Sequence, residues 1–105
     1  MTQVKAMIRP LDFDGYDDIP EHTQGALRRW VEDGFYPGSF LTAVLCNDLM
    51  GAVGSADAYN IRALKAITTF VYNRIPADAW GNAERMRAYA NKVWSMKEGV
   101  DKTED

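Results

Sequence analysis

The chain has one cysteine, one histidine and no long hydrophobic run, and each shortage excludes a class of protein. A single cysteine, Cys46, cannot build an internal disulfide framework, so the sequence suits a reducing cytoplasm. The longest nearly apolar run, FLTAVLC, is far shorter than the roughly 20 residues that a membrane-spanning helix needs. The N-terminal segment MTQVKAMIRP lacks the apolar stretch of a secretory signal. We therefore expect a cytoplasmic protein without a membrane partner.

The motifs of common enzyme classes are missing as well. The sequence contains no Gly-rich phosphate loop, no Cys/His metal-ligand spacing and no nucleophile elbow. His22 falls in the first turn of an expected helix, where a capping or surface role is commoner than that of a catalytic base. Cys46 lies in an apolar run, which is typical of a buried, unreactive thiol. We predict a non-enzymatic protein with no catalytic residues, no metal and no cofactor.

The 105 residues are 47% hydrophobic and 26% charged, which is typical of one soluble globular domain. Charge is unevenly distributed: residues 22–97 hold six acidic and nine basic residues, a net charge of +3, whereas residues 1–21 and 98–105 are both acidic. A dedicated nucleic-acid-binding domain would be markedly more basic, so nucleic acid is not the expected partner. The mildly basic middle leaves room for a small anionic ligand.

Hydrophobic periodicity predicts an all-α fold, a compact single-domain bundle of about four helices with an irregular N-terminal lead-in. The lead-in covers residues 1–18, and a short strand at 3–8 is one alternative within it. The helical domain covers 19–98, and a flexible acidic tail covers 99–105. Helices are expected at about 20–32, 40–53, 58–74 and 83–97. The expected N-caps are Ser39, Ser55 or Asp57, and Asn82, and the expected stops are Gly34, Gly54, Pro76 and Gly99.

The second expected helix is apolar almost all round, which predicts that it is the central helix of the domain. Its apolar residues are Phe40, Leu41, Val44, Leu45, Leu49, Met50 and Val53. The preceding turn, GFYPG, carries Phe35 and Tyr36, which we expect to fold back onto the core.

Asn47 and Asp48 interrupt this apolar helix, and a buried carboxylate is costly unless it is paired or hydrogen-bonded. Three interpretations stay open. In the first, the pair bonds to the backbone of a neighbouring loop and fixes its register; in the second, it forms a polar pocket for a ligand or partner; in the third, it is simply exposed. Asp57, Asn60 and Asn73 on the third expected helix could share a rim with them.

Basic and aromatic residues of the middle segment suggest a second kind of site, one for a nucleotide-like anion. The basic residues are Arg28, Arg29, Arg62, Lys65, Arg85, Arg87 and Lys92, and the aromatic residues are Trp30, Tyr36, Tyr59, Tyr72 and Trp80. A charged, solvated surface is the commoner outcome of such a pattern. The Gly-Ser joint before residue 58 also allows a helix-turn-helix, although residues 58–74 offer only Asn60, Arg62 and Lys65 to a DNA groove.

Four segments carry a resemblance to a known group of proteins: IPEHTQGALRRWVEDG, PGSFLTAVLCNDL, SADAYN and FVYNRIPADAWG. Across about residues 19–81 the chain resembles small, mostly uncharacterised accessory proteins of tailed bacteriophages. The resemblance implies a non-structural phage protein that acts in the host cytoplasm, and it implies no activity. The positions that it indicates for a family site are His22, Thr23, Asn47, Asp48, Asp57, Asn60, Asn73 and Trp80.

The function that we expect is therefore binding, as a host-takeover or anti-defence modulator that docks on a host protein. One alternative is an oligomeric protein that sequesters a small nucleotide-like ligand with Asn47, Asp48, Asn60 and basic residues. A DNA-binding regulator is the other alternative. An exposed apolar patch on one helix face would favour docking on a protein, whereas a closed polar pocket with convergent arginines would favour a small ligand.

Overall fold

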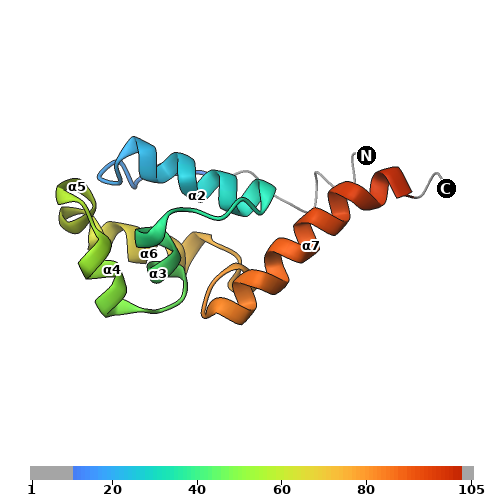
Figure 1. Ribbon diagram of the computed structural model, residues 1–105. Coiled ribbons are helices and arrows are strands. Elements are labelled where there is room, and N and C mark those ends of the chain that lie inside the picture. Colours follow the sequence, from blue (N-terminus) through green and yellow to red (C-terminus); the bar gives the residue numbers. More distant parts are fainter. Residues whose placement is uncertain (1–10, 103–105) are drawn as a thin grey trace.

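The computed structural model describes residues 11–102, with side chains as far as Lys97, and within that range it contains six α-helices, one short 3-10 helix and no strand (Figure 1). The all-α class predicted from the sequence is confirmed. The elements are α2 (Glu21–Asp33), α3 (Ser39–Leu45), α4 (Leu49–Ser55), α5 (Ala58–Arg62), α6 (Leu64–Arg74), η1 (Ala77–Ala79) and α7 (Ala83–Lys102). The predicted number of about four helices is too low because two predicted helices are each broken.

The first break divides the predicted helix 40–53 into α3 and α4. Asn47 adopts a left-handed conformation with φ of 63°, which asparagine tolerates better than most residues. The Asn47 N–H donates to Val44 O at 3.1 Å, and the Asp48 N–H donates to Ala43 O at 2.8 Å. These two bonds form a Schellman ending with asparagine in the position usually held by glycine. Apolar residues continue on both sides of the polar pair Asn47 and Asp48, and such a pair is equally compatible with a polar site on one continuous helix, so periodicity could not reveal the turn.

The second break divides the predicted helix 58–74 at Ala63. The Ala63 N–H is shared between Tyr59 O at 3.2 Å and Asn60 O at 3.1 Å, which tightens the end of α5 before α6 begins. Asp57 caps α5 and Asn82 lies directly before α7, with its side chain accepting from Arg85 N–H at 2.8 Å, both as predicted. Gly34 ends α2 in a left-handed conformation, also as predicted.

Three predicted helix boundaries are wrong. Gly38, not Ser39, holds the N-cap position of α3, and the cap makes no side-chain hydrogen bond. Helix α4 runs past Gly54 to Ser55, and α7 runs past Gly99 to Lys102. Because α7 reaches Lys102, only residues 103–105 of the predicted flexible tail, like the predicted strand at 3–8, lie outside the described residues.

Trp30 of α2 lies at the centre of the core, with no exposed surface. Its indole N–H donates to Ala79 O at 3.0 Å, and its ring lies 5.0 Å from that of Tyr36 and 5.3 Å from that of Tyr89. Further core side chains come from α6 and α7, namely Ile67, Phe70, Val71, Met86, Tyr89, Ala90 and Val93. These stripes follow the predicted helical periodicity.

The acidic lead-in is irregular over residues 11–18, as predicted, but its apolar residues join the core. Phe13 stacks on Phe70 with ring centroids 4.3 Å apart, and Leu11 is buried beside it in the same cluster. The prediction for the GFYPG turn is half wrong. Tyr36 contacts Trp30, whereas Phe35 is 65% exposed.

Candidate functional site

The polar residues indicated by the sequence do not gather at one site. They divide into three groups, each held by its own hydrogen bonds: His22, Thr23, Asp57 and Asn60; Asn47 and Asp48 beside the Trp80–Gly81 loop; and Asn73 with Tyr16. A single pocket made of all of them is therefore not present in the described residues.

The first group joins the start of α2 to the start of α5. Thr23 Oγ1 donates to Asn60 Oδ1 at 2.6 Å, and both residues are buried. Outside this pair, His22 Nε2 lies 3.4 Å from Asp57 Oδ2, with both side chains largely exposed. The group links two helix ends, and its buried side-chain polar atoms all have partners.

The Asp57 carboxyl of this group has a lowered pKa. The hydrogen bond from the Asn60 backbone N–H, assisted by His22, holds the pKa of the Asp57 carboxyl below its usual value. A lowered folded-state pKa means that the contribution of this cap to stability is present at neutral pH and is lost as the pH falls through that pKa. Asp57 is therefore a helix cap that works as a carboxylate.

The second group fixes the joint between α3 and α4. Asn47 Nδ2 donates to Gly81 O at 3.1 Å, and Gly81 N–H donates to Leu45 O at 2.6 Å, so the Trp80–Gly81 loop is tied to the end of α3. Asp48 Oδ1 caps α4 by accepting from Gly51 N–H at 3.0 Å. Both side chains are exposed. The bond of Asn47 is that of the first interpretation, because it ties down a neighbouring loop, whereas Asp48 caps its own helix α4.

Asn73 belongs to a separate region. Its Nδ2 donates to the hydroxyl of Tyr16 at 3.4 Å, and the Tyr16 ring packs edge-on against Phe70 with centroids 5.0 Å apart. This contact connects the lead-in to α6. Asn73 therefore does not share a pocket rim with Asn47.

An exposed apolar surface extends over α4 and α6, and the sequence did not reveal it. Leu49 is 65% exposed, Met50 81% and Val53 47%, whereas Ala52 is the buried residue of α4. These three residues were predicted to be core. The break at Asn47 changes the direction of the chain between α3 and α4. The second half of the predicted central helix 40–53 therefore faces outward.

The surface continues onto α6 through a shallow groove of about 120 Å³. Its lining residues come from α3, the joint, α4 and α6: Val44, Asn47, Asp48, Leu49, Ala52, Leu64 and Thr68. One helical turn after Thr68, Tyr72 is 75% exposed and lies 6.2 Å from the ring of Trp80. We call the set Leu49, Met50, Val53, Leu64, Tyr72 and Trp80 the α4–α6 face.

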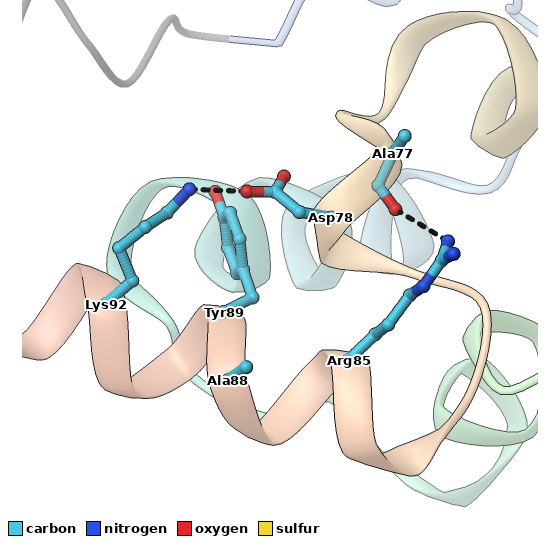
Figure 2. Close-up of a pocket in the computed structure, with 6 residues that line it drawn as sticks. All are labelled: Ala77, Asp78, Arg85, Ala88, Tyr89 and Lys92. Carbon is cyan, nitrogen blue, oxygen red and sulfur yellow. Dashed lines mark hydrogen bonds and ion pairs between the residues drawn. The ribbon is translucent and has the colours of Figure 1, made fainter.

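A second hollow, of about 430 Å³, lies between η1 and α7 (Figure 2). Its polar groups are already partnered: Lys92 pairs with Asp78, Arg85 donates to Ala77 O at 3.4 Å, and the Tyr89 hydroxyl donates to Val31 O at 2.5 Å. Burial raises the pKa of Tyr89 to about 12, so the phenol stays protonated and serves as a fixed donor. These contacts hold α7 against η1 and α2.

Cys46 lies at the joint with its Sγ 3.4 Å from Met86 Sδ. Burial, and next the negative charge of Asp48, raise the pKa of the Cys46 thiol. A raised pKa lowers the thiolate fraction at neutral pH, which is the opposite of what a nucleophile needs. This agrees with the unreactive thiol that the apolar run indicates.

The described residues contain neither a membrane-spanning helix nor a cluster of metal-ligating side chains. No helix there is long and apolar enough to cross a membrane. In the same part of the chain, no group of three or more histidine, cysteine or acidic side chains is placed to hold a metal ion.

Comparison with protein-family models, with curated proteins and with solved structures finds no match to this chain.

The role of Asp48 gives a first testable prediction. Replacing this N-cap with alanine removes the acceptor of Gly51 N–H, so we expect Asp48→Ala to lower the free energy of unfolding by about 1 kcal/mol. The thermal midpoint should fall by about 4 to 8 °C, measured by circular dichroism. Asp48→Asn, which keeps an acceptor, should lose less. Asp17→Ala, in the exposed lead-in, is the control; an equal midpoint for Asp48→Ala and Asp17→Ala would contradict the capping role.

Proposed function

We propose that this protein acts without catalysis, by docking on a partner protein through the α4–α6 face. The observation that carries the proposal is that Leu49, Met50 and Val53 project from a helix with a single buried residue. Grouped exposed apolar residues mark interaction sites, whereas single ones are ordinary, and here three of the seven residues of α4 are exposed apolar side chains. Figure 1 shows α4 at the edge of the molecule, at the end opposite to the projecting helix α7.

The composition of the face agrees with that of an interface core. Between Asp33 and Asp57 the only charged residue is Asp48, and its carboxylate is used by the cap of α4. Interface cores are depleted in charge and enriched in methionine and aromatic residues, as the α4–α6 face is with Met50, Tyr72 and Trp80.

The expected energies indicate how much of the face a partner must cover. Fully burying a leucine or methionine contributes about 1.5 to 3 kcal/mol, so Leu49 and Met50, which are mostly exposed, contribute about 3 kcal/mol together. Association itself costs at least about 4 kcal/mol. A stable complex must therefore also bury apolar surface on α6, including Tyr72.

The phage resemblance gives this docking its proposed context, a host protein in the host cytoplasm, as in a host-takeover or anti-defence modulator. The helix-turn-helix alternative fits the geometry less well. The proposed recognition helix is divided at Ala63, and Asn60 is buried against Thr23 and cannot reach a base edge.

A single charge placed on the face tests the proposal. We expect Met50→Glu to fold normally, because Met50 is 81% exposed, and to recover at least tenfold less partner in a quantitative pull-down from host bacterial extract. Phe35→Glu is the matched control, since Phe35 is similarly exposed but lies in the turn after α2. Equal loss in both variants, or no loss in Met50→Glu, would contradict docking through the α4–α6 face.

A further inference from the structure

The opposite side of α6 lines a larger groove, which the docking proposal does not use. This groove of about 710 Å³ lies between the end of the lead-in and helices α5 and α6. The lining side chains that can hydrogen-bond, pair with a charge or stack on a ring are Tyr16, Asp18, Tyr59, Arg62, Lys65 and Thr69. None of them belongs to the α4–α6 face, and the volume is within the range of about 300 to 1,000 Å³ that small-molecule sites occupy.

The two cations of the groove are available to a ligand. Arg62 and Lys65 are three residues apart along consecutive helices, and neither forms an ion pair or a side-chain hydrogen bond within residues 11–97. Five other cations of residues 11–97 are occupied: Arg28, Lys92 and Lys97 pair with carboxylates, and Arg74 and Arg85 donate to backbone carbonyls. Arg29 and Arg87 have no such partner in that range, but neither lines this groove. Two unpaired cations in one groove make an anion the expected ligand.

The groove also presents two aromatic rings. Tyr59 is 67% exposed, so its ring face is open to stacking. Tyr16 is half-buried and fixed in place, because Arg74 lies 5.2 Å from its ring centroid and Asn73 bonds to its hydroxyl. Asp18, which also lines the groove, offers a carboxylate that can accept from a sugar hydroxyl or an exocyclic amine.

We infer that this groove binds a nucleoside phosphate, with the base against Tyr59, the phosphate against Arg62 and Lys65, and a ribose hydroxyl against Asp18. Stacking on tyrosine together with pairing of phosphate to basic side chains is the chemistry by which proteins hold nucleotides. A single nucleotide fits better than a nucleic-acid strand, because the lead-in also carries exposed Asp14 and Asp17, which repel a continuous phosphate backbone.

Isothermal titration calorimetry with AMP and ADP tests this inference. We expect saturable binding to the wild type, at least tenfold weaker binding to the double variant Arg62→Ala/Lys65→Ala, and several-fold weaker binding to Tyr59→Ala. Arg87→Ala, which removes an exposed cation on α7, is the control and should bind as the wild type does. All four residues are exposed, so circular dichroism should show unchanged folding.

Ligand fragments separate the base from the phosphate. Adenosine and inorganic phosphate should each bind at least tenfold more weakly than AMP. No binding of AMP or ADP at millimolar concentration, or binding that the Arg62→Ala/Lys65→Ala variant retains, would overturn the inference. Tighter binding of a short single-stranded oligonucleotide than of AMP would overturn the choice of a single nucleotide. Because these residues lie off the α4–α6 face, either proposal can fail without the other.

Discussion

Replacing Trp30 with alanine is expected to lower the free energy of unfolding by about 3 to 5 kcal/mol, a large part of the total stability of a domain of this size. Trp30 is fully buried, and its indole links α2 to Ala79 O of η1. The substitution leaves a cavity between Tyr36 and Tyr89 and leaves that carbonyl without its donor. Urea denaturation followed by circular dichroism measures the loss.

Trp30→Phe separates packing from the hydrogen bond, since it keeps most of the ring contacts and removes the indole N–H. We expect it to cost less than Trp30→Ala and to cost more than an exposed aromatic substitution such as Tyr72→Phe. A Trp30→Ala protein with an unchanged denaturation midpoint would contradict the placement of Trp30 at the centre of the core.

Replacing Thr23 with valine is expected to destabilise the protein by about 1 to 3 kcal/mol, because buried Asn60 Oδ1 loses the hydroxyl that donates to it at 2.6 Å. Valine preserves the shape of threonine, so the loss reports the hydrogen bond. Thr69→Val, at an exposed position of α6, is the control and should change stability by less than about 0.5 kcal/mol.

A double-mutant cycle completes this test. If Thr23 and Asn60 form one structural pair, Thr23→Val and Asn60→Ala should be strongly non-additive. Additive effects, or a stable Thr23→Val protein, would show that the pair does not hold α2 to α5. In that case the assignment of Thr23 and Asn60 to a binding site, which the phage resemblance implies, would regain support.

Much of the fold could be predicted from the sequence because its core stripes follow helical periodicity. Leu27, Trp30 and Val31 in α2, and Met86, Tyr89 and Val93 in α7, are buried as their spacing predicts. The two helix breaks could not be predicted. One depends on the left-handed φ of Asn47 and the other on the tight turn at Ala63. The polar pair Asn47–Asp48 is equally compatible with a site on a continuous helix, and Ala63 leaves the apolar pattern unchanged.

The candidate sites were less predictable, because they depend on which surfaces the breaks turn outward. The residues Leu49, Met50 and Val53 have the composition of a core and become exposed only because α4 starts in a new direction. Similarly, the sequence offered seven basic residues for an anion site, and only the fold selects Arg62 and Lys65 by placing them beside Tyr16 and Tyr59. Tyr16 was not among the predicted site residues, since it lies in the acidic lead-in.

Site-specific photo-crosslinking tests the docking function most directly. A photo-crosslinking amino acid placed at position 50, in place of Met50, should give one discrete covalent adduct with a host protein in living host cells. The same amino acid at position 87, in place of exposed Arg87 on α7, should give none. Loss of the adduct when Leu49 and Val53 are also changed to serine would confirm that the α4–α6 face is the contact surface. The same adduct from positions 50 and 87, or no adduct from position 50, would contradict docking through that face.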